Sequence, residues 1–177
     1  MTGTELDAPV VIVVDDDPMV RRALDSLFRS IGLATTLYES ATAFLADQPH
    51  SRVSCIITDV RMPGVSGLDF QKALTAQGVT TPVIVITGHG DVPMSVGAMK
   101  AGAVDFLTKP FRDQDLIDAV NEALERDRRT RERAGDVAGV EARYAQLTPR
   151  ERQVMDLVVG GLMNKQAAAE LGLPQPV

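Results

Sequence analysis

The sequence is poor in the residues that build several common kinds of site. Its single cysteine, Cys55, excludes an internal disulfide and a cysteine-rich zinc site. Its two histidines, His50 and His89, are too far apart in the sequence to form a local metal-binding motif. The longest purely apolar run, residues 10–14, is far shorter than the roughly 20 residues of a membrane-spanning helix, so we expect no membrane association. Residues 1–9 carry neither a basic start nor an apolar stretch, which excludes a secretory signal and predicts a cytoplasmic protein.

The chain also lacks the excess of basic residues that is typical of nucleic-acid-binding proteins. It has 24 acidic and 18 basic residues among 177, a net charge of −6, and all of this net charge falls within residues 1–130. Residues 131–177 are neutral overall, so a DNA-binding function has to be argued from a motif. With 45% hydrophobic residues the chain can form a core, and its length allows one domain together with a small second unit.

Residues 1–125 alternate between short β-rich runs and helical patterns, which is typical of an α/β fold with a parallel sheet. The first run, residues 10–14, is apolar at every position, as in a strand that is covered on both faces. Asp17 followed by Pro18 indicates the start of a helix. The apolar spacing predicts that its buried face consists of Val20, Leu24, Leu27, Phe28 and Ile31. We expect strands at residues 10–14, 34–38, 53–58, 83–87 and 104–107. We expect helices that begin near Pro18, Ser40, Leu68, Pro93 and Asp113.

The helical apolar spacing stops after Glu125, and residues 126–136 are mostly charged, with mixed signs. This composition predicts a solvated helical extension that fades into a linker. The alternative interpretation, a coiled-coil dimer stalk, lacks apolar residues at the heptad positions. We therefore expect three segments, at residues 1–125, 126–143 and 144–177.

Polar side chains follow the strands of the predicted sheet. Asp15 and Asp16 come at the end of the first strand, Asp59 at the end of the third, Thr87 at the end of the fourth and Lys109 after the fifth. Open α/β sheets bind ligands at the carboxyl ends of their strands. Three carboxylates there would repel one another by about 4 kcal/mol per close pair, and a hard divalent cation such as Mg²⁺ removes this penalty. A metal-held carboxylate can attack phosphorus, while a lysine and a hydroxyl bind the transferred oxygens.

Four segments with this order and spacing resemble the receiver domain of two-component response regulators, of the FixJ/NarL-like class. They are Val13-Val-Asp-Asp-Asp-Pro18, Thr58-Asp-Val-Arg-Met-Pro-Gly64, Ile86-Thr-Gly-His-Gly90 and Gly102-Ala-Val-Asp-Phe-Leu-Thr-Lys-Pro-Phe111. The resemblance covers about residues 9–125. It implies a flavodoxin-like (βα)5 fold with the parallel strand order 2-1-3-4-5.

The resemblance also implies a role for individual residues. Asp59 is the expected phosphoacceptor, and Mg²⁺ is expected to bind Asp16 directly, Asp15 through water, Asp59, and the backbone carbonyl of Arg61. Lys109 and Thr87 are the expected phosphate-binding residues. The bond from Lys109 to Pro110 is expected to be cis, and Thr87 and Phe106 are the expected switch pair. Phosphorylation is expected to favour a homodimer through the face formed by helix four, strand five and helix five.

Residues 147–173 resemble the start of a LuxR-type helix-turn-helix. Thr148-Pro-Arg-Glu151 matches a capping box, and residues 165–171, ended by Gly172, match the first helix of the pair. Because the sequence stops five residues after Gly172, it holds no groove-filling recognition helix, and we assign no DNA-binding residue. Two interpretations stay open, a shortened two-domain regulator and a natural variant with another tail. We expect residues 144–177 to be weakly folded on their own.

The leading hypothesis is a response regulator, not an enzyme, that accepts phosphate from a sensor histidine kinase on Asp59 and assists its own phosphotransfer and dephosphorylation. It would control transcription by dimerising and through a LuxR-type output domain, and it would bind DNA only if that domain is complete. One alternative is a receiver that acts as an interaction or phosphorelay module without binding DNA. Another is a phosphohydrolase that uses Asp15 as nucleophile and Asp17 as acid.

Overall fold

The computed structural model describes residues 8–47, 52–89, 92–162 and 164–172. The chain divides into two compact units, Met1–Arg131 and Glu132–Val177. None of the described helices is long and apolar enough to cross a membrane.

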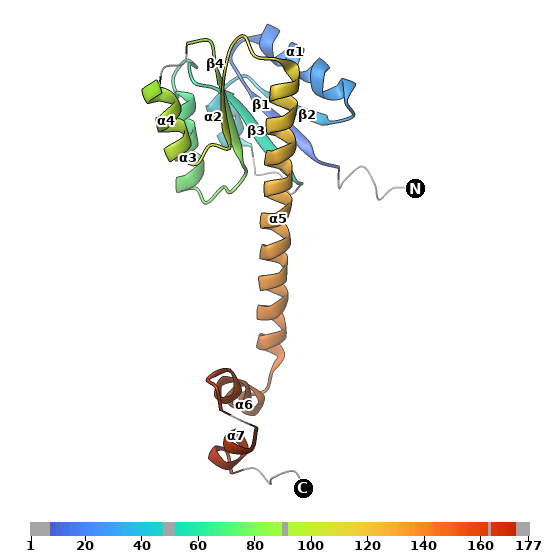
Figure 1. The fold of residues 1–177 in the computed structure, drawn as a ribbon, viewed down its shortest axis with the longest axis vertical. Coiled ribbons are helices and arrows are strands. Elements are labelled where there is room, and N and C mark those ends of the chain that lie inside the picture. Colours follow the sequence, from blue (N-terminus) through green and yellow to red (C-terminus); the bar gives the residue numbers. More distant parts are fainter. Residues whose placement is uncertain (1–7, 48–51, 90–91, 163, 173–177) are drawn as a thin grey trace. The chain divides into compact units, whose positions relative to one another are not determined.

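The first unit is built on a five-stranded parallel sheet in the order β2-β1-β3-β4-β5, which confirms the predicted flavodoxin-like fold (Figure 1). The strands are β1 Val10–Val14, β2 Ala34–Tyr38, β3 Ser54–Asp59, β4 Val83–Thr87 and β5 Asp105–Thr108. The helices that connect and follow them are α1 Pro18–Ser30, α2 Ala41–Ala46, α3 Gly67–Ala76, α4 Val92–Lys100 and α5 Asp113–Gln146.

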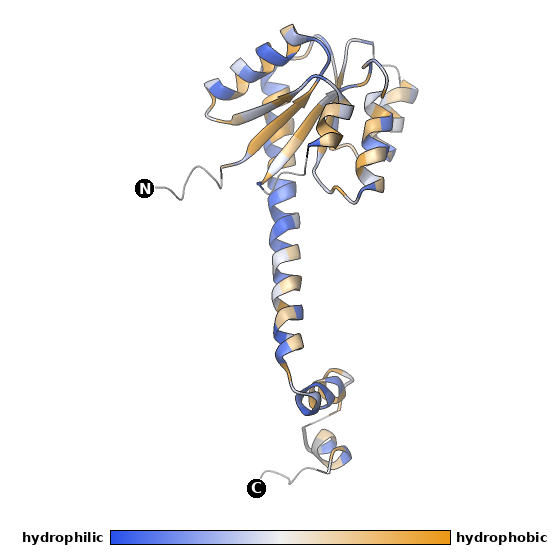
Figure 2. Ribbon diagram, turned by 180° about the vertical axis from the view of Figure 1, so that it is seen from behind, coloured by the Kyte–Doolittle hydropathy of each residue, from blue (hydrophilic) through white to orange (hydrophobic). Residues whose placement is uncertain are grey.

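Alternate residues of the central strands enter two different cores, one on each face of the sheet. Ile12 and Val14 of β1 pack with residues of α2, α3 and α4, whereas Val11 and Val13 pack with residues of α1 and α5. All five residues of β1 are therefore buried, and the central strands appear as continuous hydrophobic ribbons in Figure 2. Coverage on both faces explains why the sequence of these strands is an apolar run without alternation.

Helix α1 ends one residue earlier than its apolar pattern indicates. Asp17 is its N-cap, and the Asp17 carboxylate accepts a hydrogen bond from the backbone N–H of Met19 at 2.8 Å. The prediction that Ile31 belongs to the buried face is wrong, because Ile31 is the C-cap and is 45% exposed. The chain turns away at Gly32, whose φ of 81° lies in the left-handed region that glycine adopts without strain.

Helix α5 continues through the charged segment as far as Gln146. Ion pairs between side chains three or four residues apart support it there, since Glu125 lies 3.1 Å from Arg128 and 3.2 Å from Arg129. The prediction that this segment is solvated is wrong for Asp127, which is only 1% exposed.

The second unit contains α6, Pro149–Val159, and α7, Asn164–Glu170, after the end of α5. The predicted capping box is confirmed, because Thr148 and Glu151 exchange side-chain to backbone hydrogen bonds at the start of α6. That helix ends at Val159 with Gly160 as its C-cap, and Gly161, with a φ of 94°, turns the chain after it. The unit exposes apolar side chains on α6, including Val159 at 77%.

Candidate functional site

Polar side chains from the ends of four neighbouring strands, β1, β3, β4 and β5, lie at the carboxyl edge of the sheet. Asp15 directly follows β1, Asp59 ends β3 and Thr87 ends β4. The parallel register places Asp59 beside Ile86, so the ends of β3 and β4 lie at the same level. Lys109 follows β5, and its backbone N–H donates to the carbonyl of Thr87 at 2.8 Å. The backbone alone therefore brings these four residues to one edge.

One ammonium group contacts two of these carboxylates. Lys109 Nζ lies 3.0 Å from Asp59 Oδ2 and 3.8 Å from Asp15 Oδ2. The Asp15 and Asp59 side chains are 2% and 14% exposed, and that of Lys109 is 28% exposed. The peptide bond from Lys109 to Pro110 is cis. The Lys109 ammonium group is thus shared by the carboxylates of Asp15 and Asp59, and both carboxylates are largely shielded from water.

Asp15 accepts hydrogen bonds on one carboxylate oxygen and on its backbone carbonyl, whereas its other carboxylate oxygen accepts none. Asp15 Oδ1 accepts the backbone N–H of Asp17 at 2.8 Å, and the Asp15 carbonyl accepts a hydrogen bond from Arg21 at 2.6 Å. Oδ2 is buried and accepts no hydrogen bond from the residues that the structure describes. Burial is the main reason why the pKa of Asp15 is raised, against the opposing effects of the Asp17 N–H and of Lys109. The Asp59 and Asp16 charges raise it further.

The other residues that the sequence singled out surround this pair in different ways. Asp59 Oδ1 accepts the backbone N–H of Arg61 at 2.9 Å, which places the Arg61 backbone next to the carboxylate. Thr87 is fully buried, and its Oγ1 accepts the backbone N–H of His89 at 3.2 Å. Asp16 is exposed and forms no ion pair within the described residues. Phe106 is half-buried on β5 and packs against the core formed with α2, α3 and α4.

The donor set fits a hard divalent cation of the magnesium type. No three His, Cys, Asp or Glu side chains among the described residues are close enough to enclose a metal ion. Mg²⁺ does not need such an enclosure, since proteins commonly hold it through one or two carboxylates and leave several waters in place. The buried Asp15 Oδ2, which accepts no hydrogen bond, and the neighbouring Asp59 carboxylate are oxygen donors of this kind.

Gly67 is a residue of this site that the sequence did not reveal. It begins α3, and its backbone N–H donates to the Val60 carbonyl at 2.9 Å, which closes the loop that starts at Asp59. A Cβ atom at Gly67 would lie far inside van der Waals contact with the Asp59 carbonyl oxygen. Glycine is therefore needed for the helix to approach the backbone of Asp59. The only hint in the sequence was its position, because a glycine lies where the loop after Asp59 meets the predicted helix.

Comparison with known proteins agrees with this geometry. Residues 11–121 match the response regulator receiver domain family, and residues 145–175 match the bacterial regulatory proteins of the luxR family. The chain belongs to the response regulators. This confirms the family resemblance, and it places the chain among signalling proteins of two-component systems that combine a receiver with a LuxR-type segment.

Several curated relatives share both parts. Nodulation protein W of Bradyrhizobium diazoefficiens is 54% identical over 94% of this chain and 73% of its own length. Transcriptional regulatory protein FixJ of Azorhizobium caulinodans is 51% identical over 92% of this chain and 77% of its own length. Among solved structures, response regulator StyR matches with a TM-score of 0.85 and 44% identity, covering 94% of this chain and 84% of StyR.

Proposed function

We propose that this response regulator is switched by phosphorylation of Asp59, with a sensor histidine kinase as the donor. The observation that carries the proposal is the contact of Lys109 Nζ with both Asp59, at 3.0 Å, and Asp15, at 3.8 Å. An Asp59 oxygen attacks the phosphorus of the phosphohistidine. The bond between phosphorus and the histidine nitrogen breaks, a bond between phosphorus and the Asp59 oxygen forms, and the product is an acyl phosphate.

Asp15, Asp16, Asp59 and the Arg61 carbonyl are the groups that would hold Mg²⁺ at this edge. When bound, the ion supplies positive charge to the carboxylates and to the oxygens of the transferred group. Asp15 suits this role because its Oδ2 is buried without a hydrogen-bond donor and Lys109 Nζ lies 3.8 Å away, so a bound cation would supply a closer partner. The same groups would assist the later hydrolysis of the acyl phosphate.

Lys109 and Thr87 would bind the phosphoryl oxygens. Lys109 Nζ already contacts Asp59 Oδ2 and would extend this contact to the added group. The Thr87 oxygen accepts a hydrogen bond from His89, which leaves its O–H free to donate toward the phosphoryl group. Movement of Thr87 would open space for Phe106, which lies on the neighbouring strand β5, to turn inward.

The proposed consequence of this movement is a homodimer through α4, β5 and α5. The exposed apolar residues of α4 support it, because Val92, Val96 and Met99 are 76%, 44% and 47% exposed. Exposed apolar side chains that lie together on one element are typical of interaction surfaces.

A groove beside the site is suited to docking the kinase. It has a volume of about 380 Å³ and lies between α1 and the residues that follow β5. Its lining is mostly apolar, including Ala23, Leu27 and Phe111, and it reaches Lys109. A protein that seats an apolar surface here would have its phosphohistidine close to Asp59.

We further propose that dimerisation controls transcription through the LuxR-type segment. On this view residues 1–125 act as the receiver, residues 126–143 as the connection and residues 144–177 as part of the output domain. DNA would be bound when that output domain is complete. The alternative is an interaction or phosphorelay module. It would be favoured if a longer version of the chain, with a complete output domain, dimerises on phosphorylation but binds no DNA.

The decisive experiment measures the mass of the protein in solution, by light scattering, with and without beryllofluoride and Mg²⁺. We expect the wild type to dimerise, and we expect Asp59→Asn to remain unchanged. Asp69→Asn, which removes an exposed carboxylate of α3, is the matched control and should respond like the wild type. A wild type that does not respond, or an Asp59→Asn variant that does, would refute the proposal.

A further inference from the structure

The apolar heptad positions that residues 126–136 lack are present directly after them. Val137, Val140, Tyr144 and Leu147 follow one another at spacings of three, four and three residues. A spacing that alternates between three and four residues is typical of the a and d positions of a coiled coil. The first three lie on α5 and Leu147 directly follows its end, all within the second unit. This stretch therefore carries the pattern of a short coiled coil.

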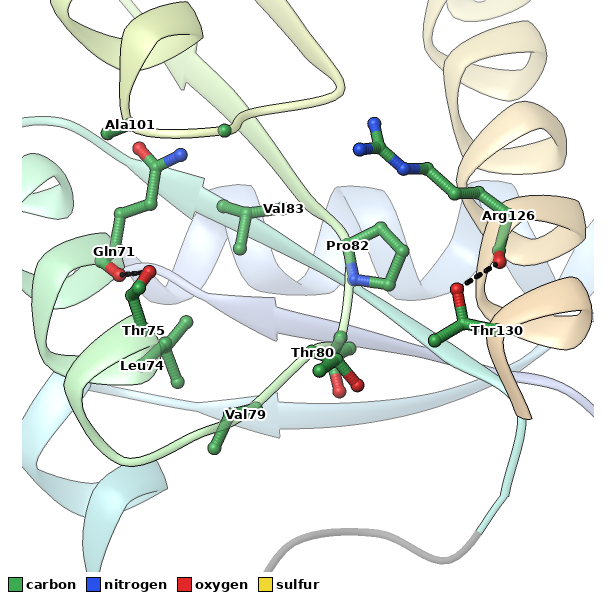
Figure 3. Close-up of a pocket in the computed structure, with 12 residues that line it drawn as sticks. Gln71, Leu74, Thr75, Val79, Thr80, Pro82, Val83, Ala101, Arg126 and Thr130 are labelled. Carbon is green, nitrogen blue, oxygen red and sulfur yellow. Dashed lines mark hydrogen bonds between the residues drawn. The ribbon is translucent and has the colours of Figure 1, made fainter. Parts of the chain in front are cut away.

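The earlier part of α5 differs from this stretch, because it packs against the first unit. Figure 3 shows Arg126 and Thr130 of α5 lining the same hollow as Pro82, which precedes β4. This packing ends where the second unit begins. Residues 132–146 are all exposed, apart from the half-buried Gly139.

A helix of this composition is poorly stabilised in a single copy. Gly135 and Gly139 lie in its interior, and each costs a helix about 1 kcal/mol relative to alanine. Helices in proteins owe most of their stability to the packing of an apolar face. Here that face is open, since Val137 and Val140 are both 57% exposed and Tyr144 is 36% exposed. A partner that covers these side chains would supply the packing that the stretch lacks.

The start of α6 is attached to the same end of α5. The Arg152 guanidinium lies 5.3 Å from the centre of the Tyr144 ring, a cation–π contact, and it donates to the Ala145 carbonyl at 2.8 Å. Helix α6 belongs to the segment that matches the luxR family. A partner that contacts Tyr144 would therefore also help to fix the position of α6.

We propose that residues 137–147 of two copies of this chain pair as a parallel coiled coil. A second copy is the occupant that the pattern selects, because a seam of a and d residues packs best against a helix with the same spacing. Valine at an a position, as at Val137, and leucine at a d position, as at Leu147, favour a two-stranded pair. The parallel arrangement brings the two LuxR-type segments to the same end of the pair.

Two features keep this pairing weak on its own. Four side chains bury far less than the roughly 800 Å² per partner of a standard interface. Asp136 and Glu141 occupy the flanking g and e positions, where the two copies of a parallel pair place them side by side with like charge. The pairing thus needs a second contact that raises the local concentration of the two helices. The receiver homodimer supplies this contact, so the inference rests on the proposed function, and phosphorylation would close the seam.

Disulfide trapping in the full chain tests the pairing. Val140→Cys places a thiol on the seam, and Ala142→Cys, on the opposite face of the same helix, is the matched control. Cys55 is fully buried and burial raises the pKa of its thiol, so it stays unreactive. With beryllofluoride, Mg²⁺ and a mild oxidant, Val140→Cys should form linked dimers at least about tenfold faster than Ala142→Cys, whose Cβ atoms point apart. Equal rates would overturn the seam.

A reversal of charge tests the direction of the two helices. In a parallel pair Glu141→Lys turns the repulsion from Asp136 into attraction, and it should speed trapping at Val140→Cys by about three- to tenfold. In an antiparallel pair position 141 faces its own copy, so like charges would remain and trapping would not speed up. Glu132→Lys makes the same change of charge at an outer position and should leave the rate unchanged.

The outcomes separate the seam from the proposed function. If beryllofluoride doubles the mass of the wild type but Val140→Cys is trapped no faster than Ala142→Cys, the seam is overturned and the phosphorylation switch is not. If the mass of the wild type does not change, the proposed function is refuted. The seam is then judged in a Glu141→Lys background at high protein concentration, where Val140→Cys should still be trapped faster than Ala142→Cys and equal rates would overturn it.

Discussion

The buried carboxylate of Asp127 gives a sharp test of how α5 is fixed to the sheet. Asp127 Oδ2 accepts the backbone N–H of Ser54, at the start of β3, at 2.9 Å. It also accepts a hydrogen bond from Arg131, one turn further along α5, at 2.6 Å. The Asp127 side chain is 1% exposed and that of Arg131 is 34% exposed.

The expected cost of Asp127→Ala follows from these contacts. The Ser54 N–H would be left buried without an acceptor, which costs about 1–3 kcal/mol. Arg131 is partly exposed and can turn into water, so losing its ion pair adds at most about 1 kcal/mol. The substitution also removes a buried charge and the Asp127 Oδ1 atom, which is buried without a hydrogen bond. Both changes favour the folded state and offset part of this cost. We therefore expect a loss of about 2 kcal/mol in the free energy of unfolding, which corresponds to a decrease of about 4–8 °C in Tm.

Urea unfolding followed by circular dichroism measures this change, and Ser54→Ala is the matched control. Ser54 Oγ is buried with no partner among the described residues, and the substitution keeps the backbone N–H that bonds to Asp127. Ser54→Ala should therefore be neutral or slightly stabilising. If Asp127→Ala unfolds at the wild-type urea concentration, the hydrogen bond to Ser54 does not hold α5 in the way described.

Three further predictions concern other parts of the first unit. Tyr38 should ionise only at about pH 12, because burial and the neighbouring carboxylate raise its pKa to about 12. The contribution of Tyr38 to stability should be present below about pH 10 and lost as the pH rises through 12. Tyrosinate absorbance in a Tyr144→Phe background measures the ionisation, and urea unfolding at each pH measures the stability. Gly67→Ala should cost about 1–3 kcal/mol in thermal unfolding and impair phosphorylation, because its methyl group would displace the backbone of Asp59. Asp15→Asn should raise Tm without metal, because burial disfavours the charged form that prevails above its raised pKa. The same variant should lose the Mg²⁺-dependent rise in stability, which for the wild type reaches about 2.7 kcal/mol at 100 times the Kd.

The sheet could be predicted from the sequence because its strands are covered on both faces. An apolar run such as residues 10–14 has few alternative structures, and the bounds of β1, β2 and β4 agree with the prediction. The meeting of Asp15, Asp59 and Lys109 was likewise predictable, since the carboxyl ends of parallel strands lie at one edge.

Contacts that join distant segments could not be predicted in this way. Asp127 lies in a charged run and is 73 residues away from its partner Ser54, so nothing local distinguishes it from its solvated neighbours. Its burial depends on which face of α5 meets the sheet. Gly67 is similar, because the need for glycine arises only when α3 approaches the backbone of Asp59. Ile31 follows the helical period but lies beyond the end of the helix.

The two ends of β3 show why one edge of the sheet is structural and the other is suited to the proposed phosphorylation. At the amino edge the Asp127 carboxylate has its own cation, Arg131 at 2.6 Å, and a backbone donor at 2.9 Å, so its charge is balanced within α5 and β3. At the carboxyl edge Lys109 is shared by Asp59 and Asp15, and the charge of Asp16 adds to the repulsion at Asp15. The carboxyl edge therefore has more negative charge than its own residues neutralise, and the energy of this imbalance favours the uptake of a cation. A phosphoryl group that binds together with a cation can contact Lys109 at this edge. At the amino end of β3 the cation Arg131 is already paired with Asp127.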